Sequence, residues 1–300
     1  MRVFEEARQP TRAEMLAGVS DADGLLCMLT DRIDRELLDA APRLKVVSNY
    51  AVGVDNIDVA ACTERRIPVA NTPGVLTDAT ADIAFALLLA AARRVVEADA
   101  YVRSGDWKQW APALLLGRDL AGATLGIAGM GAIGQALARR GHGFGMRIVY
   151  TSRSPRPQAE AQTGAVRVGK DALLAQSDFL SLHVPLTPET RGYLGAREFA
   201  LMKPTAILVN TSRGAVLDQR ALTAALQAGR PAFAALDVMD PEPMSPDDPL
   251  LTLPNVVVAP HLGSATHETR GRMAVLAVEN LLAVLEGRRP RHCVNPEVLG

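Results

Sequence analysis

A glycine-rich turn between a short apolar strand and a helical segment most constrains the fold of this chain. The aliphatic run 124–128 leads directly into Gly129-Met130-Gly131-Ala132-Ile133-Gly134, and residues 135–140 read as a helix. In a βα unit this GxGxxG pattern is typical of dinucleotide binding, because its glycines permit a tight turn, close approach of a pyrophosphate and close helix–strand packing. The alternative is a glycine-rich turn with a structural role only.

Further aliphatic runs recur along the chain with helical segments between them, which is typical of βα units and a mostly parallel sheet. The middle of the chain supplies strands for one doubly wound, Rossmann-type sheet: 124–128, 147–150, 178–183, 206–210, 233–238 and 256–259. Earlier runs would form a smaller α/β unit: 24–28, 45–48 and 68–70. The final helix, residues 266–286, would return to pack on this smaller unit.

The expected architecture is therefore α/β with two domains. A smaller, flavodoxin-like domain would comprise residues 1–93 and the C-terminal helix and tail, 268–300, and the dinucleotide-binding domain would comprise residues 94–267. Asp218 is the expected N-cap of a helix that Gly229 ends. Helix 79–92 has little polar face, which also suits a subunit interface.

Composition excludes several classes of function. Lys and Arg number 32 against 33 Asp and Glu, for a formal net charge of -1, so nucleic acid is not an expected partner. The longest apolar run, 83–92, is much shorter than the roughly 20 residues that a membrane-spanning helix needs. No apolar signal segment opens the chain, and the cysteines lack metal or redox spacing, so a reducing, cytoplasmic location is expected.

The end of the strand after the glycine-rich turn favours one dinucleotide over another. An NAD site usually carries Asp or Glu about 20 residues after the turn, where it binds the ribose hydroxyls. Here the chain reads Thr151-Ser152-Arg153 without an acid, and Arg153 offers a planar cation to a 2′-phosphate. NADP(H) is therefore the expected cofactor, and an NAD(H) site that lacks the acid is the alternative.

Polar side chains follow three of the expected strands. Arg213, Glu242 and His261 each come shortly after the end of such a strand. Ligands of open α/β sheets bind outside the carboxyl ends of the strands, so these side chains are candidates for one site. Taken singly, each also has a structural explanation: a surface arginine on a turn, an acid in a proline-rich loop, or a histidine that caps a helix.

The order and spacing of the motifs resemble one family. The chain is similar to the D-isomer-specific 2-hydroxyacid dehydrogenases, and within them to the glyoxylate/hydroxypyruvate reductases, through these segments: 49–58, 71–82, 129–134, 182–190, 210–214, 237–243 and 260–266. The resemblance implies reduction of small 2-keto acids to D-2-hydroxy acids. That reaction needs a hydride donor, a proton donor, and cationic or dipolar groups for the carboxylate and carbonyl.

The resemblance also assigns roles in catalysis. His261 would donate the proton in reduction, and Glu242 would orient the imidazole and favour its protonated form. Arg213 would bind the substrate carboxylate and carbonyl oxygen, a task that suits its planar guanidinium. The main-chain N–H groups of Val52 and Gly53 would bind the other carboxylate oxygen.

The cofactor contacts implied by the resemblance fall into three groups besides the glycine-rich turn. Thr80 would face the phosphates, and Ile133 would lie at the helix start beneath the pyrophosphate. Val184 and Pro185 would flank the adenosine side. The nicotinamide end would meet Thr211, Asp237 and Gly263, and the Asp237 carboxylate would accept a hydrogen bond from the carboxamide.

Two further features of the sequence invite interpretation. Trp107 and Trp110 are the only tryptophans and would share a helix face if their segment is helical. One interpretation is a hydrophobic anchor at the domain junction. The resemblance implies instead that Trp110 reaches the active site of a partner in a homodimer. His267 and Glu268 follow His261, but their spacing fits no usual zinc pattern and no metal is expected.

Departures from the family and competing functions complete the expectations. Family members usually carry a strand and helix before the position of Met1, so the smaller domain is expected to lack its first βα unit. One competing function is an NADH-linked dehydrogenase of phosphoglycerate, which would need cations in residues 48–58, and that segment has none. Another is a formate dehydrogenase, which pairs the histidine with Gln, whereas this chain has Glu242. A non-catalytic dinucleotide sensor, as in the C-terminal binding protein corepressors, shares the fold.

Overall fold

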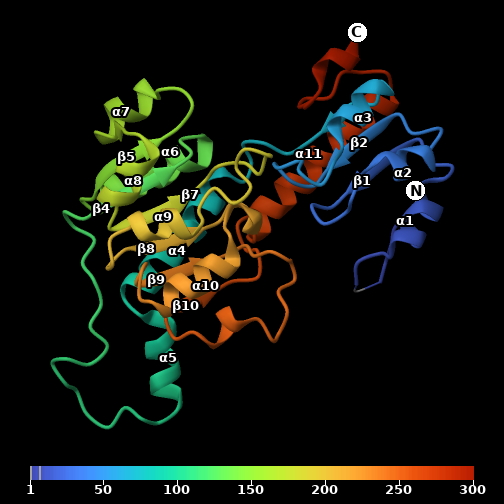
Figure 1. Cartoon of the computed structure of the whole chain (residues 1–300). Helices are drawn as coiled ribbons and strands as arrows, with labels where there is room; N and C mark the ends of the chain where they lie inside the picture. Colours follow the sequence, from blue (N-terminus) through green and yellow to red (C-terminus); the bar gives the residue numbers. More distant parts are fainter. Residues whose placement is uncertain (1, 7) are drawn as a thin grey trace. The chain divides into compact units, whose positions relative to one another are not determined.

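The computed structural model describes residues 2–6 and 8–300, and the chain divides into two compact units (Figure 1). The small unit comprises Met1–Leu76 and Thr266–Gly300, and the large unit comprises Thr77–Ala265. The first boundary falls before helix α4 (Thr77–Ala92), earlier than the expected residue 93, because α4 packs on strands of the large unit.

The large unit is built on a parallel sheet. In the described residues its strands are β4 (Thr124–Ala128), β5 (Arg147–Thr151), β6 (Val166–Arg167), β7 (Phe179–Leu182), β8 (Ile207–Asn210), β9 (Phe233–Leu236) and β10 (Val256–Val258). Their order is β10-β9-β8-β7-β4-β5-β6, and every neighbouring pair is parallel. The expected doubly wound α/β sheet is confirmed, and the short strand β6 is an addition at one edge.

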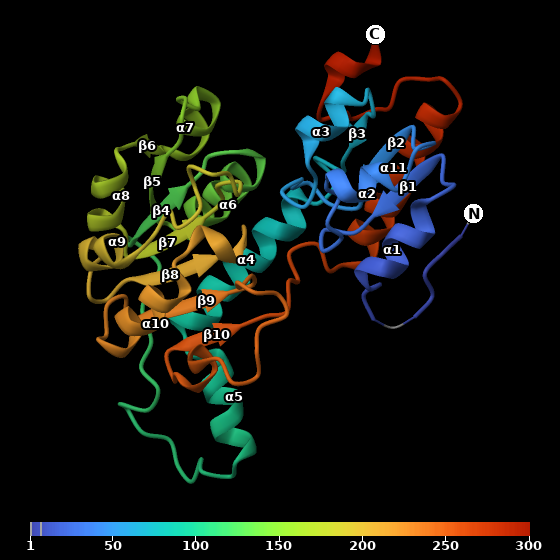
Figure 2. The same ribbon diagram turned by 45° about the vertical axis from the view of Figure 1, so that its right-hand side comes forward.

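Helices cover both faces of this sheet (Figure 2). One apolar cluster joins α4 and α6 to one face, and a second cluster joins α8, α9 and α10 to the other, so the central strands β4, β7 and β8 are buried throughout. Besides α4, the helices of the large unit are α5 (Val95–Arg103), α6 (Ala132–Gly143), α7 (Pro157–Thr163), α8 (Lys170–Gln176), α9 (Ala196–Leu201), α10 (Gln219–Gln227), and the 3-10 turns η1 (Gly214–Val216) and η2 (Pro249–Thr252).

The apolar character of α4 is explained within its own unit. Phe85 and Leu88 are buried in the same cluster as Ile127 of β4 and Leu137 of α6. Burial of such side chains is the dominant favourable term in folding, so the apolar faces that suggested a subunit interface are needed for the core.

The small unit is also α/β. Among its described residues, the strands β1 (Gly24–Cys27), β2 (Val46–Asn49) and β3 (Val69–Ala70) are parallel in the order β1-β2-β3. Helix α11 packs on all three strands. The helices are α1 (Arg12–Val19), α2 (Arg35–Asp39), α3 (Val59–Glu64), α11 (His267–Leu285) and the 3-10 turn η3 (Pro296–Leu299).

Side-chain hydrogen bonds fix several element ends. Asp218 accepts a hydrogen bond from the N–H of Ala221 at 3.0 Å, which confirms it as the N-cap of α10, and Gly229 follows the helix at φ 74°. In the small unit, Asn295 accepts from the N–H of Val69 at 2.8 Å and so ties the C-terminal tail to β3. Within residues 2–6 and 8–300, no helix combines the length and apolar character that crossing a bilayer requires.

Candidate active site

His261 lies in the turn after β10, at the carboxyl end of the sheet. Its N–H donates to the carbonyl oxygen of Asp237 at 2.9 Å, and the N–H of Leu262 donates to Oδ1 of Asp237 at 2.6 Å. These bonds accompany a φ of 54° at His261, in the left-handed region that few residues with side chains adopt. Such conformations persist where the surrounding structure enforces them, typically at functional sites.

Glu242 is the hydrogen-bond partner of the His261 ring. Its Oε2 lies 2.9 Å from Nδ1 of His261, and its Oε1 accepts from the N–H of Met239 at 2.9 Å. Burial alone would raise the pKa of Glu242, but the hydrogen bonds from His261 and Met239 and the nearby charge of Arg213 outweigh burial and hold the pKa below its usual range. The carboxylate is therefore ionised at neutral pH, and Nε2 of His261 is the ring nitrogen left to exchange a proton.

The turn after β8 presents Arg213. The side-chain amide of Asn210 donates to the carbonyl oxygen of Arg213 at 2.9 Å. A Cβ atom on Gly214 would lie 1.9 Å from the carbonyl carbon and oxygen of Met239, so only glycine allows the turn after β8 to pack on the turn after β9. This packing brings the Arg213 guanidinium near enough to Glu242 to lower the pKa of that carboxyl.

The glycine-rich turn has the geometry that its sequence predicts. Gly129 has a φ of 99°, and a Cβ there would lie 2.5 Å from the carbonyl oxygen of His183. A Cβ on Gly134 would lie 2.2 Å from the carbonyl oxygen of Gly129, whereas one on Gly131, at the start of α6, would meet nothing within 4 Å. The first and third glycines are thus required by packing, and the second borders open space at a helix N-terminus, where an anion is favoured.

Two buried polar atoms suit a nicotinamide ring. Thr211 and Asp237 follow the paired strand ends of β8 and β9, and among the described residues Oγ1 of Thr211 and Oδ2 of Asp237 have no hydrogen-bond partner. Burial raises the pKa of Asp237, although the Leu262 N–H and the nearby His261 act in the opposite direction. Buried polar groups are costly without partners, and a carboxamide offers both donors and an acceptor, so these residues fit the ring.

The structure groups Thr80 with this end of the site. Its hydroxyl donates to the carbonyl oxygen of Gly263 at 2.9 Å, and a Cβ on Gly263 would lie 3.4 Å from Oδ2 of Asp237 and 3.5 Å from the Thr80 side chain. The sequence predicts Thr80 at the phosphates, and its contacts place it beside two residues that the sequence predicts at the nicotinamide. Helix α4, which carries Thr80, packs on β8, β9 and β10.

The remaining predicted cofactor residues lie at the start of α6 or follow β5 and β7, the two strands that pair with β4. Ile133 lies in the first turn of α6, and Val184 and Pro185 follow β7. Ser152 and Arg153 follow β5, where the hydroxyl of Ser152 donates to the carbonyl oxygen of Ser154 at 2.5 Å. These residues therefore lie at the carboxyl edge of the same sheet as the glycine-rich turn.

The sequence predicts His183 at the end of a strand, but in the structure His183 directly follows β7. Its Nε2 lies 2.8 Å from Oγ of Ser181, and burial lowers the pKa of His183 to about 4, so the ring is neutral near pH 7. Its main chain packs against Gly129. His183 thus supports the glycine-rich turn, a role that only the three-dimensional contact shows.

Val52 and Gly53 lie in the small unit, in the turn after β2. Asn71 donates to the carbonyl oxygen of Val52 at 2.8 Å, and Asn49 donates to that of Gly53 at 2.8 Å. These bonds hold the turn in place, and its N–H groups are the donors that a carboxylate can accept from. Sequence reasoning missed the roles of Asn49 and Asn71, although both open motif segments of the resemblance.

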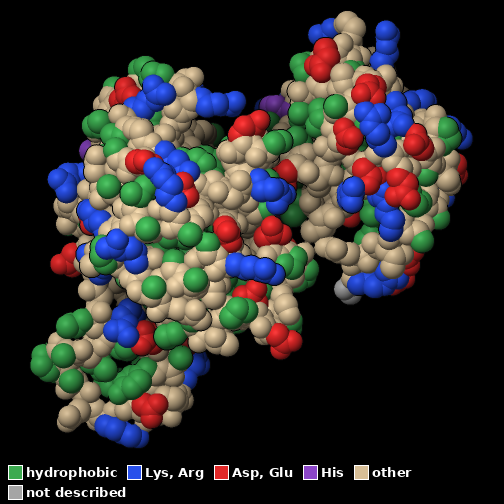
Figure 3. All heavy atoms as spheres, viewed as in Figure 1, with side chains coloured by type: hydrophobic (Ala, Val, Ile, Leu, Met, Phe, Trp, Pro, Cys, Tyr) green, Lys and Arg blue, Asp and Glu red, His purple; other side chains and the backbone are tan. Residues whose placement is uncertain are grey.

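The tryptophan segment differs from its prediction. Residues 104–118 contain no helix, so Trp107 and Trp110 do not share a helix face. Trp107 is 54% exposed and Trp110 is 78% exposed, so the large unit does not bury either ring as an anchor. Figure 3 shows hydrophobic side chains on the part of the large unit that α5 and this segment form.

Residues near His261 do not form a metal centre. Over residues 2–6 and 8–300, no three His, Cys, Asp or Glu side chains are placed so that they could hold an ion. His267 begins helix α11 in the small unit, beyond the boundary at Ala265.

A parallel sheet with a glycine-rich turn and a histidine–carboxylate pair beside an arginine defines a class of dinucleotide-dependent oxidoreductases. Residues 85–263 match the family model described as D-isomer specific 2-hydroxyacid dehydrogenase, NAD binding domain. The chain belongs to the D-isomer-specific 2-hydroxyacid dehydrogenase family, and it is therefore an enzyme that uses a nicotinamide dinucleotide.

Individual relatives agree with this assignment. The chain is 54% identical over 303 residues to a glyoxylate reductase of Thermococcus litoralis, covering 100% of this chain and 91% of the relative. It is 53% identical, with a TM-score of 0.91, to the TT0316 protein of Thermus thermophilus, covering 96% and 91% of the two chains. An NADPH-dependent glyoxylate/hydroxypyruvate reductase of Sinorhizobium meliloti, solved with NADP and malonate, is 36% identical with a TM-score of 0.85, covering 93% and 85%.

Proposed function

We propose that this enzyme reduces small 2-keto acids, glyoxylate and hydroxypyruvate foremost, to the corresponding D-2-hydroxy acids, with NADPH as the preferred donor. The observation that supports this proposal most directly is the 2.9 Å contact between Glu242 and the His261 ring, with Arg213 nearby at the end of β8. The names of the Thermococcus litoralis and Sinorhizobium meliloti relatives support the substrate class.

In the proposed reaction each residue of the site has one task. The bound dinucleotide supplies the hydride. His261 donates the proton from Nε2 to the carbonyl oxygen of the substrate, while Glu242 holds the ring and balances its charge. Arg213 binds the carboxylate and polarises the carbonyl, and the N–H groups of Val52 and Gly53 take the other carboxylate oxygen.

The proposed cofactor site extends along the carboxyl edge of the sheet. The pyrophosphate would lie on the glycine-rich turn at the N-terminus of α6, and the carboxamide would meet the partnerless atoms of Thr211 and Asp237. The residues that would contact the cofactor are Thr80, Gly129, Gly131, Ile133, Gly134, Ser152, Arg153, Val184, Pro185, Thr211, Asp237 and Gly263.

The preference for NADPH rests on the end of β5. Thr151 is followed by Ser152 and Arg153, so the chain has no acid at the position where an NAD site usually binds the ribose hydroxyls. Arg153 is exposed at this point and can bind that phosphate. The NADP bound in the Sinorhizobium meliloti relative supports the same choice.

We also propose a cytoplasmic homodimer. Exposed apolar side chains gather on α5 and the segment after it: Val95, Val96, Val102, Trp107, Trp110 and Leu116. A second copy that covers them would remove this apolar surface from water, and Trp110 would then limit the shape of substrates in the partner's site. The free thiols of Cys27, Cys62 and Cys293 fit a reducing compartment.

The proposed activity is tested by turnover. Purified protein would be mixed with NADPH or NADH and a panel of 2-keto acids, and loss of reduced nicotinamide absorbance would be followed. Glyoxylate and hydroxypyruvate with NADPH should give the highest kcat/KM, and the product from hydroxypyruvate should be D-glycerate. Preference for 3-phosphohydroxypyruvate would contradict the substrate, and no turnover by folded protein would favour a dinucleotide sensor.

A further inference from the structure

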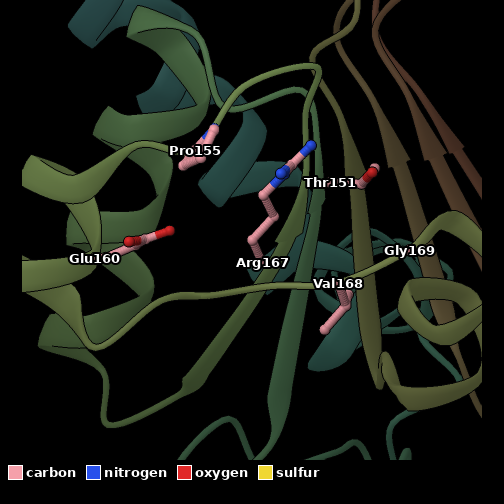
Figure 4. A pocket seen from close by; sticks show the side chains of 6 residues that line it. All are labelled: Thr151, Pro155, Glu160, Arg167, Val168 and Gly169. Atoms are coloured by element: carbon pink, nitrogen blue, oxygen red, sulfur yellow. The ribbon is translucent and has the colours of Figure 1, made fainter.

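The turn after β5 is held from one side by an arginine of the edge strand. Nε and Nη2 of Arg167 donate to the carbonyl oxygen of Ser152 at 3.1 and 2.9 Å, and Nη2 also donates to the carbonyl oxygen of Arg153 at 3.0 Å. Figure 4 shows the Arg167 side chain extending from β6 toward the loop between Thr151 and Pro155. One guanidinium therefore binds two successive carbonyl groups of this loop.

Other hydrogen bonds fix the rest of the loop. The Ser152 hydroxyl donates to the carbonyl oxygen of Ser154 at 2.5 Å, so three successive carbonyl groups have donors. The N–H of Arg156 donates to the Tyr150 hydroxyl at 2.8 Å, and Nε of Arg156 donates to the carbonyl oxygen of Met130 in the glycine-rich turn at 3.1 Å. The loop is thereby tied to the glycine-rich turn as well as to β6.

The bonds to Arg167 determine where two N–H groups point. In a planar trans peptide the C=O and the following N–H point in opposite directions. Because Arg167 draws the carbonyls of Ser152 and Arg153 to one side, the N–H groups of Arg153 and Ser154 point to the other side. In the described residues neither N–H has an acceptor. Successive N–H groups in a turn form a concavity that attracts anions.

Arg167 borders open space beside the loop. An open pocket of about 540 Å³ lies there, lined by Thr151, Pro155, Glu160, Arg167, Val168 and Gly169. The Arg167 side chain is exposed, so its truncation would remove these hydrogen bonds to the loop without opening a cavity in the core.

We propose that Arg167 is a positioning residue that shapes the Ser152–Ser154 turn into a receptor for the 2′-phosphate of NADP(H). This inference rests on the proposed preference for NADPH. The N–H groups of Arg153 and Ser154 and the Arg153 guanidinium bind the phosphate, and Arg167 acts from behind them by keeping the carbonyl groups of Ser152 and Arg153 turned away. Arg167 thus sets cofactor selectivity from a strand outside the usual dinucleotide motif.

The test is direct binding, measured by titration calorimetry with NADP⁺, NAD⁺, 2′,5′-ADP and 5′-AMP. Arg167→Gln should weaken NADP⁺ and 2′,5′-ADP about tenfold, since each well-placed charge-assisted hydrogen bond contributes at that level, and should leave NAD⁺ and 5′-AMP unchanged. Arg167→Lys keeps the charge without the fork and should recover only part of the loss. The matched control is Arg147→Gln, at the opposite end of β5, where Nη2 contacts the Thr124 hydroxyl.

The outcomes separate this inference from the proposed function. A wild-type protein that binds NADP⁺ no more tightly than NAD⁺ overturns the proposed cofactor preference, and the role of Arg167 with it. If the wild type prefers NADP⁺ and Arg167→Gln keeps that preference, only the proposed role of Arg167 is overturned. Equal weakening of NADP⁺ and NAD⁺ would show a general structural effect and would likewise overturn it, and unchanged thermal melting ensures that the variant is folded.

Discussion

Gly214 and Met239 are in such close contact that a single added methyl group would overlap the Met239 carbonyl at 1.9 Å. This contact joins the turns after β8 and β9. Arg213, the proposed substrate-binding cation, lies on the first turn, and Glu242, the hydrogen-bond partner of His261, follows on the second. The distance between Arg213 and Glu242 therefore depends on Gly214, which has no side chain.

Gly214→Ala should therefore damage the site more than the fold. The turn carrying Arg213 must shift away from Met239, and misplacement by about 1 Å can lower kcat/KM by about 10²-fold. Overpacking should also lower the free energy of unfolding by about 1–3 kcal/mol. Steady-state kinetics and thermal melts check both. Gly143→Ala is the control, because a Cβ there meets nothing within 4 Å; equal behaviour of the two variants would contradict the prediction.

His261→Gln should lower kcat on the order of 10²-fold or more, because the proton donor is lost. Binding of the dinucleotide, measured by calorimetry, should change little, since the main-chain bonds of residue 261 to Asp237 do not require the ring. Near-normal turnover would remove His261 from its proposed role.

Glu242→Gln should change both the rate of reduction and the pH dependence of stability. The amide keeps the shape of the side chain but removes the negative charge beside the ring of the proposed proton donor, so kcat should fall, and steady-state kinetics measure the fall.

The lowered pKa of Glu242 determines how the free energy of unfolding depends on pH. The folded-state pKa of Glu242 is lowered, so its stabilising contribution is fully present above the unfolded pKa of about 4.3 and is lost as the pH falls through the folded value. The stability difference between wild type and Glu242→Gln should therefore shrink as the pH drops below about 4. Urea melts at a series of pH values measure it, and a difference that grows toward low pH would be inconsistent with the pairing.

Ser152→Asp combined with Arg153→Ala should reverse the cofactor preference toward NADH. The new carboxylate can bind the ribose hydroxyls and repels a 2′-phosphate, whose cationic partner is removed. The ratio of kcat/KM for NADPH and NADH is the measurement. An unchanged ratio would show that the 2′-phosphate binds elsewhere.

Trp107→Ser with Trp110→Ser should weaken the proposed homodimer, because both exposed rings would leave the interface. Sedimentation equilibrium should show a dimer dissociation constant raised by about tenfold or more. Leu251→Ser, which alters an exposed apolar side chain on η2 of the same unit, is the control. A wild-type protein that stays monomeric would overturn the dimer, and the role of Trp110 with it.

Features that depend on neighbours along the chain could be predicted from the amino-acid sequence. A strand, a glycine-rich turn and a helix in succession identified the Gly129 turn, and Asp218 marked a helix start. Because the carboxyl ends of parallel strands share one edge of a sheet, the strand order also placed Arg213, Glu242 and His261 at one edge.

Features that depend on contacts between distant segments became visible in the folded chain. Helix α4 joins the large unit because its partners are strands far along the chain, and Thr80 lies beside Gly263 for the same reason. The hold of Arg167 on the Ser152 carbonyl and the contact of Gly214 with Met239 likewise leave no local signal. Packing of this kind is set by which surfaces meet after the chain has folded, and a linear pattern does not record it.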